Sequence, residues 1–201
     1  MAIKVANNQS LTAITALPSA VSVGAMTLLQ TQTASNSSTI SFTSNIDSTY
    51  DEYVFKFYDI HPNHSSYTDF QFNMSVDGGS NYNVTKTCAY FSAIHLENNS
   101  YADKEYNTSL DTHQGTGFQT LTDNTGNDND QSLAGTLIIY APSNTTFVKH
   151  FMSRIANYEN TSAIDTFVAG YGNTTSAVNA VQFKFLNDNI QSGVIKLYGI
   201  R

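Results

Sequence analysis

The chain has 201 residues, of which 40% are hydrophobic and only 12% charged, and its formal net charge is −7. Its length suits one large β-domain, since such domains run to about 200–250 residues. The few Lys and Arg residues are scattered singly, whereas nucleic-acid binding needs a clustered basic face, and no apolar stretch approaches the roughly 20 residues that span a bilayer. The composition therefore excludes nucleic acid and membrane as partners.

Residues 1–24 differ from the rest because they contain no aromatic residue and are mostly small or β-branched. They lack the charged region, apolar core and cleavage site of a secretory signal, so we expect synthesis in a cytoplasm. We predict an extended arm that docks on a neighbouring subunit, a sheet edge or a scaffold; a disordered terminus is the alternative. The predicted contact residues of the arm are Ile3, Val5, Leu11, Ile14 and Leu17.

Alternation of apolar and polar residues predicts β-strands through most of the remaining chain. It is unbroken from Phe70 to Val76 and from Val181 to Phe185, and it places one set of side chains in a core and the other in solvent. Turn-forming Asn, Asp, Gly and Pro separate these segments, and no stretch keeps a helical period. The predicted strands lie near residues 26–33, 38–43, 52–60, 69–77, 84–96, 132–140, 146–156, 163–171, 179–186 and 193–200.

Residues 97–131 break this pattern. They are polar, with Tyr101, Tyr106 and His113 spaced among Asn, Asp, Thr and Gly. A loop of this length in a compact β-domain is usually functional or lies at a contact. The sequence as a whole predicts an all-β protein: an antiparallel, jelly-roll-like β-sandwich over residues 25–201, preceded by the arm.

The segment from Ser75 through Asp77 and Gly79 to Tyr82 fits the pattern Ser-x-Asp-x-Gly-x-x-aromatic. It resembles the Asp-box hairpin of sialidase propellers, in which the Asp braces a turn and Gly supplies a positive φ. The pattern occurs once, and no cluster of Arg residues follows that would hold a sialic acid carboxylate. We therefore interpret the segment as a structural brace of a hairpin rather than as part of a glycosidase site.

Two segments carry candidate metal ligands. Asp123, Asp128 and Asp130 lie in a loop rich in the oxygen ligands that Ca²⁺ prefers, but no Glu closes an EF-hand pattern, and a solvated turn is the favoured interpretation. His61 and His64 stand close together, yet no third ligand has a fitting spacing. We expect no metal and no other cofactor.

The sequence patterns of common catalytic sites are missing, among them the nucleophile elbow, the zinc-binding His-Glu-x-x-His and the phosphate-binding glycine loop. Cys88, the only cysteine, lies in an apolar segment and is interpreted as a packed core thiol. Paired carboxylates for glycoside hydrolysis need not be close in sequence, so this alternative stays open. We predict a protein without catalytic residues, which is not an enzyme.

Aromatic residues in loops are the remaining candidates for a binding site. Tyr67, Tyr101 and Tyr106 fall in or beside predicted loops, with His113 in the same polar segment as the last two. A ring in such a place can stack on a sugar or a protein partner, whereas most other Phe and Tyr residues must fill the core.

A set of short phrases between residues 28 and 200 carries a family resemblance: 29–35, 50–53, 75–79, 126–133, 147–150, 168–171 and 193–200. Together they resemble small virion structural and tail-fibre-like proteins of marine tailed bacteriophages, chiefly cyanophages. Residues 1–24 are the part least similar to that family. The resemblance implies a role in the virion and carries over no catalytic residue.

The resemblance and the arm lead to one functional hypothesis and one alternative. We expect a non-enzymatic virion surface protein, either a capsid decoration or cement protein or a short tail-attached fibre, assembled in the cytoplasm of a bacterial host. Its expected partners are phage capsid or tail proteins and further copies of itself, with a trimer favoured. The alternative is a receptor-binding tail-fibre module that recognises a host surface glycan through residues 97–131.

Overall fold

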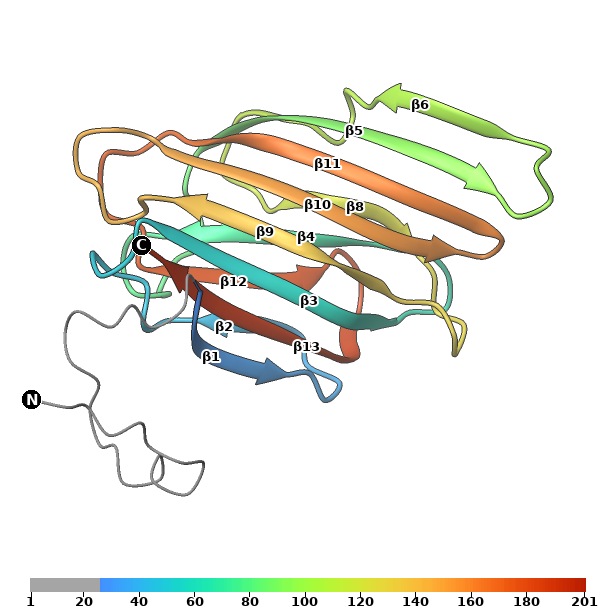
Figure 1. The fold of residues 1–201 in the computed structure, drawn as a ribbon, viewed down its shortest axis with the longest axis horizontal. Coiled ribbons are helices and arrows are strands. Elements are labelled where there is room, and N and C mark those ends of the chain that lie inside the picture. The colour runs from blue at the N-terminus through green and yellow to red at the C-terminus, as the bar shows by residue number, and fades with distance from the viewer. Residues whose placement is uncertain (1–25) are drawn as a thin grey trace, which may run out of the picture.

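The computed structural model describes residues 26–201, so the predicted arm and its contact residues lie outside the described part. Residues 26–201 form 13 strands and no helix. The strands make a nine-stranded and a four-stranded antiparallel sheet, which Figure 1 shows as two layers with the larger sheet in front. This architecture confirms the predicted antiparallel β-sandwich, while the finer jelly-roll designation stays a prediction.

The strand order of each sheet follows from the hydrogen-bonded pairs. The large sheet runs in the order β1 (Thr27–Thr33), β13 (Asn189–Ile200), β3 (Glu52–Asn63), β9 (Leu133–Tyr140), β10 (Lys149–Glu159), β11 (Ser162–Gly172), β5 (Lys86–Leu96) and β6 (Ala102–Tyr106), with β7 (Thr112–Gly115) also paired to β5. The small sheet runs in the order β2 (Ile40–Phe42), β12 (Ala180–Phe185), β4 (Thr68–Ser75) and β8 (Gln119–Thr125).

A cluster of phenylalanine rings fills the space between the two sheets, with Phe183 of β12 at its centre. The Phe183 ring centroid lies 5.2 Å from the rings of both Phe55 and Phe57 on β3. It also lies 6.2 Å from Phe42 on β2 and 5.9 Å from Phe70 on β4. All five side chains are almost completely buried. Three of these pairs pack edge to face and the pair with Phe70 is stacked. Both geometries add to the hydrophobic gain of burying each ring, so the cluster holds the two sheets together.

The strands predicted from alternation are all present, but the prediction of a long loop at 97–131 is wrong. This segment contains β6, β7 and β8. Strand β8 belongs to the small sheet although Leu121 is its only buried apolar residue; Gln119, Thr122 and Thr125 are polar and at most 1% exposed. The polar groups of Gln119 and Thr122 bond inside the protein; for example, Gln119 Nε2 donates to the carbonyl of Leu110 at 2.9 Å, and the Thr122 and Thr166 hydroxyls lie 3.1 Å apart. A buried polar strand has no apolar alternation, so the sequence pattern could not reveal it.

Two lysine side chains are fully buried at one end of the large sheet. Lys86 of β5 and Lys149 of β10 both pair with Gly172 of the intervening β11. Lys86 Nζ donates to Asn73 Oδ1 at 2.6 Å and to the carbonyl of Val84 at 2.9 Å. Among residues 26–201 no carboxylate forms an ion pair with either lysine. Burial without a counter-charge lowers the pKa of Lys149, and it lowers the pKa of Lys86 to about 8.

The segment with the Asp-box pattern connects β4 of the small sheet to β5 of the large sheet. The predicted hairpin is therefore wrong, because the flanking strands are not paired with each other. The predicted bracing is confirmed: Ser75 Oγ donates to Asp77 Oδ1 at 2.7 Å, and the amide of Asn81 donates to the same oxygen at 2.9 Å. Gly79 has φ +91, and a Cβ there would lie 2.8 Å from Thr43 Cγ2, so the turn requires glycine.

Replacing Asp77 by alanine will lower the melting temperature at neutral pH, because the turn loses its bracing carboxylate. Hydrogen bonds from Asn81 and Ser75 hold the pKa of Asp77 at about 2, below its ordinary value of 3.8. The contribution of a carboxylate with a depressed folded-state pKa is present above about pH 4 and is lost as the pH falls through about 2. Melting curves at pH 7 and pH 2 should show the difference from wild type shrinking in acid. Asp51→Ala is the matched control; an equal loss in both variants would contradict the bracing role.

Candidate functional site

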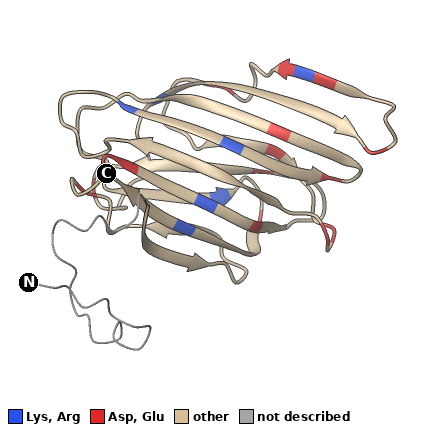
Figure 2. Ribbon diagram, in the orientation of Figure 1, with Lys and Arg blue, Asp and Glu red and all other residues tan. Residues whose placement is uncertain are grey.

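The outer face of the large sheet carries a row of side chains that crosses eight strands. Cross-strand pairing places the members of this row next to each other, and we call it the cation–aromatic row. From β6 to β1 it consists of Tyr106, Phe91, Phe167, Arg154, Thr136, Lys56, Lys196 and Thr31. Figure 2 shows its basic residues as blue segments on β10, β3 and β13.

One end of the row is an aromatic platform. The rings of Phe91 and Phe167 are nearly parallel, with an interplanar angle of 5° and centroids 5.0 Å apart. The Arg154 guanidinium lies over Phe167, 4.8 Å from the ring centroid. Phe91 and Tyr106 remain 48% and 55% exposed. Exposed rings in a rigid sheet offer large apolar surfaces at low cost in conformational entropy.

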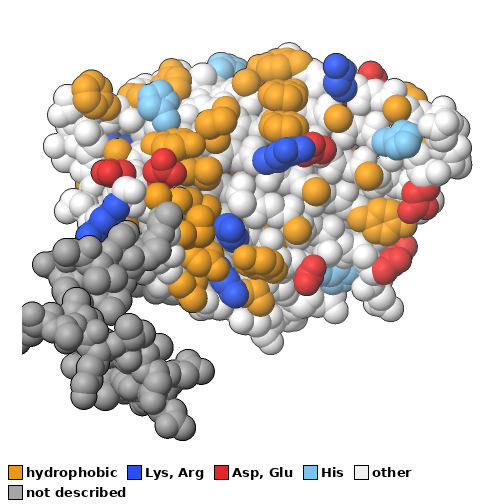
Figure 3. Space-filling model, in the orientation of Figure 1, with side chains coloured by type: hydrophobic (Ala, Val, Ile, Leu, Met, Phe, Trp, Pro, Cys, Tyr) orange, Lys and Arg blue, Asp and Glu red, His pale blue; other side chains and the backbone are white. Residues whose placement is uncertain are grey.

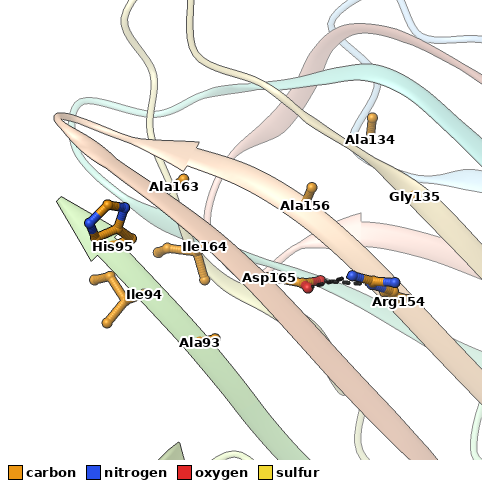
Figure 4. A pocket seen from close by; sticks show the side chains of 10 residues that line it. All are labelled: Ala93, Ile94, His95, Ala134, Gly135, Arg154, Ala156, Ala163, Ile164 and Asp165. Atoms are coloured by element: carbon orange, nitrogen blue, oxygen red, sulfur yellow. Dashed lines mark hydrogen bonds and ion pairs between the residues drawn. The ribbon is translucent and has the colours of Figure 1, made fainter. Parts of the chain in front are cut away.

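Arg154 is held in place by a second contact. Its Nε and Nη2 atoms donate to the two carboxylate oxygens of Asp165 at 3.0 and 2.8 Å. Such a bidentate pair fixes the plane of the guanidinium. The pair lines an open groove of about 540 Å³ on the sheet surface. The groove forms where the side chains are short, as at Ala93, Ala134 and Ala156. Figure 4 shows the ion pair between β10 and β11 with these side chains around it.

The part of the row towards β1 is basic. Lys56 and Lys196 stand directly opposite each other on β3 and β13. Lys56 Nζ lies 5.7 Å from the ring centroid of Tyr198, and Lys196 Nζ lies 5.3 Å from that of Tyr58. Each ammonium group is therefore positioned by a neighbouring ring. Like charges directly opposite each other on a sheet are destabilising, so this arrangement favours a bound anion.

A second row on the same face is apolar, although the outer face of an antiparallel sheet is usually polar. Its members lie two residues along each strand from the cation–aromatic row, or three on β1 because of a β-bulge: Ala89, Ala169, Met152, Ile138, Val54, Tyr198 and Leu28. Met152 and Leu28 are 53% and 51% exposed. Figure 3 shows hydrophobic side chains gathered into bands on this face, with basic side chains between them.

The four predicted partner-binding residues are divided between the two sheets. Tyr67 immediately precedes β4 of the small sheet, and His113 lies on β7. Tyr101 precedes β6, and its hydroxyl donates to Asp103 at 3.2 Å. Tyr106, whose hydroxyl donates to Asp111 at 2.8 Å, belongs to the cation–aromatic row. The structure therefore does not bring the four together. It places Tyr106 in one row with Arg154, Lys56 and Lys196, which are far apart in the sequence.

The predicted metal-ligand candidates make contacts within the protein. Asp123 Oδ1 accepts a hydrogen bond from the Tyr90 hydroxyl at 2.7 Å, and Asp128 Oδ2 lies 3.5 Å from Gln131 Nε2. His61 Nδ1 lies 2.6 Å from the carbonyl of Gln131. Within residues 26–201, no three side chains of His, Cys, Asp or Glu gather in a metal-binding arrangement, so Asp123, Asp128 and Asp130 do not form a shared site there.

Two groups with raised pKa values bear on the enzymatic alternatives. Cys88 is buried as predicted, and its Sγ donates to Gln119 Oε1 at 2.8 Å. Burial raises the pKa of this thiol, which disfavours the nucleophilic thiolate. Burial, with a smaller contribution from the charge of Asp123, raises the pKa of Glu159. A raised carboxyl pKa suits a general acid, but a glycosidase also needs a second carboxylate across a substrate cleft.

Within residues 26–201 no helix has the length and apolar character needed to cross a bilayer. Comparison of the chain with protein-family models, with curated proteins and with solved structures finds no match.

Proposed function

We propose that this chain is a non-enzymatic surface protein of a bacteriophage particle, either a capsid decoration or cement protein or a short tail-attached fibre. Residues 1–24 anchor it to a capsid or tail protein, and residues 25–201 are displayed as a β-sandwich. The chain acts as a homo-oligomer, with a trimer favoured, and is located in the virion after assembly in the host cytoplasm.

The observation that carries this proposal is the position at which the arm, residues 1–24, joins the sandwich. The described chain begins at Met26, directly before β1, and β1 is the edge strand of the large sheet. Within residues 26–201, β1 pairs only with β13. The other side of an edge strand offers backbone N–H and C=O groups to a further strand, which is how many proteins attach extended segments. Anchoring at this edge leaves the broad outer face of the large sheet free.

That free face supports the alternative function of a receptor-binding module. Binding surfaces that recognise external ligands present side chains from a rigid scaffold. The cation–aromatic row is presented by paired strands rather than by the predicted loop, so we propose this row as the recognition surface if the protein contacts a host glycan.

Deleting residues 1–24 will abolish incorporation into particles and leave a folded sandwich. The reason is that the aromatic core lies entirely within the described strands, while the proposed anchor precedes them. Incorporation is measured by mass spectrometry of purified particles produced with the variant, and folding by the melting temperature of the isolated protein. Replacing residues 1–24 by a Gly/Ser segment of equal length is the matched control and should fail equally. Normal incorporation of either variant would refute the anchoring role, and an unfolded product would mean that the arm belongs to the core.

A further inference from the structure

We propose that the cation–aromatic row binds an acidic polysaccharide, a chain of uronic acid units whose carboxylates pair with Lys56, Lys196 and Arg154. The inference rests on the proposed display of the sandwich at a particle surface and names the class of ligand for that display.

The first argument is charge complementarity. Among residues 26–201, Lys56 and Lys196 form no ion pair, and residues 1–25 contain no Asp or Glu that could supply one. The two lysines therefore face each other across neighbouring strands with their charges uncompensated. A carboxylate between them removes the repulsion. The local positive charge of Lys56 and Lys196 contrasts with the net charge of the protein, which is −7.

The second argument is the spacing and position of the third cation. Arg154 lies three strands away from Lys196, and strands are about 4.8 Å apart, so the two backbones are separated by about 14 Å. Thr136 and Lys56 lie between them in the same row. An elongated ligand with repeated anionic groups can contact all three cations at once, whereas a single small anion cannot.

The third argument is the apolar surface at one end of the cations and along one flank of them. Sugar rings have apolar C–H faces and polar edges, so they stack on aromatic rings while their substituents make hydrogen bonds. Phe91 and Tyr106 continue the row beyond Arg154 with about half of each side chain exposed. The neighbouring apolar row adds Met152 and Tyr198 along the same path. A polyuronate combines both features, since each ring has an apolar face and carries one carboxylate.

The arrangement fits a protein or nucleic-acid partner less well. The centre of a protein–protein interface is usually depleted of charged residues and has its polar groups at the rim. Here the cations run from Arg154 on β10, near the middle of the strand order, to Lys196 on β13, and the phenylalanines lie on the other side of Arg154. Affinity for nucleic acid grows with the number of phosphates neutralised, and this row offers only three cations.

The test is titration calorimetry of the full-length chain with oligogalacturonate at low salt. We expect binding that weakens as salt is added, and the double variant Lys56→Gln, Lys196→Gln should weaken it by at least about tenfold through loss of two charge-assisted contacts. Lys184→Gln is the matched control, because Lys184 also lies over a ring, Phe118, but belongs to the small sheet. It should bind as wild type does. The methyl-esterified oligosaccharide, which lacks the charges, should not bind the wild-type chain.

Further variants separate the aromatic platform from the originally predicted loop. Phe91→Ser should weaken binding without changing its salt dependence, whereas Tyr101→Ala should leave it unchanged. No binding to the wild-type chain, or equal binding by the lysine double variant, would overturn the proposal. So would tighter binding of a single-stranded oligonucleotide, or loss of self-association of the protein in the double variant, measured by light scattering. Incorporation into particles tests the anchoring role of residues 1–24, and calorimetry tests the glycan site. The two hypotheses can therefore be refuted independently.

Discussion

Replacing Phe183 by alanine will lower the free energy of unfolding by about 3–5 kcal/mol, the usual range for removing a buried phenylalanine. Phe183 is completely buried and lies within 6.2 Å, between ring centroids, of four other phenylalanines that come from both sheets. The variant leaves a cavity at the one place where β2, β3, β4 and β12 meet, and neighbouring rings cannot close it without leaving their own contacts. Urea denaturation followed by fluorescence or circular dichroism measures the loss.

Phe147→Ala is the matched control for Phe183→Ala, because the same atoms are removed from a side chain that is 68% exposed. This control should change the free energy of unfolding by less than about 0.5 kcal/mol, as surface substitutions usually do. A loss of under 1 kcal/mol in Phe183→Ala would show that the aromatic cluster does not hold the two sheets together.

Replacing Lys86 by methionine will change the stability in a way that depends on pH. Burial lowers the pKa of Lys86 to about 8 in the folded protein, whereas the ordinary value is 10.5. Below pH 8 the lysine is charged in both states, and the folded state carries the full cost of burying the charge. Between pH 8 and 10.5 the folded state releases its proton first, so the wild-type protein gains stability as the pH rises. Methionine has no such change.

Between pH 8 and pH 9.5 the stability difference between Lys86→Met and wild type should therefore shift in favour of wild type by about 1–2 kcal/mol, since one pKa unit corresponds to about 1.4 kcal/mol. Cys88, whose raised pKa has the opposite effect on stability as the pH rises, is charge-coupled to Lys86, so both proteins are compared in a Cys88→Ala background. Lys184→Met is the control for removing a lysine from an outer face. A difference between Lys86→Met and wild type that stays constant over this pH range would show that folding does not lower the pKa of Lys86, as expected for a side chain that reaches solvent.

Much of the fold could be predicted because alternation records which face of a strand is buried. Residues 181–185 illustrate this: Val181, Phe183 and Phe185 are buried, while Gln182 and Lys184 are partly exposed. The same signal failed for β8, whose buried side chains other than Leu121 are Thr and Gln. The signal also could not find Lys86 and Lys149, because burial of a lysine depends on carbonyl and amide oxygens supplied by distant segments.

The candidate site was less accessible to prediction because it depends on which strands are neighbours. Arg154, Lys56 and Lys196 come from strands widely separated in sequence, and only the pairing of β10, β9, β3 and β13 places them in one row. Phe91 follows Ala89 and Tyr90 in an apolar run, so alternation could not show that it faces outward. Tyr106 was found because a polar sequence context marks an exposed ring, but its partners on β5 and β11 were hidden by strand order.

The most direct test of the account is a cryo-electron microscopy map of the intact phage particle that contains this chain. We predict density for residues 1–24 in contact with a capsid or tail protein, or with a neighbouring copy bound to one, and the sandwich of residues 25–201 projecting with the outer face of its large sheet exposed. A map in which residues 1–24 form a strand of their own sandwich and contact no other molecule would contradict the account.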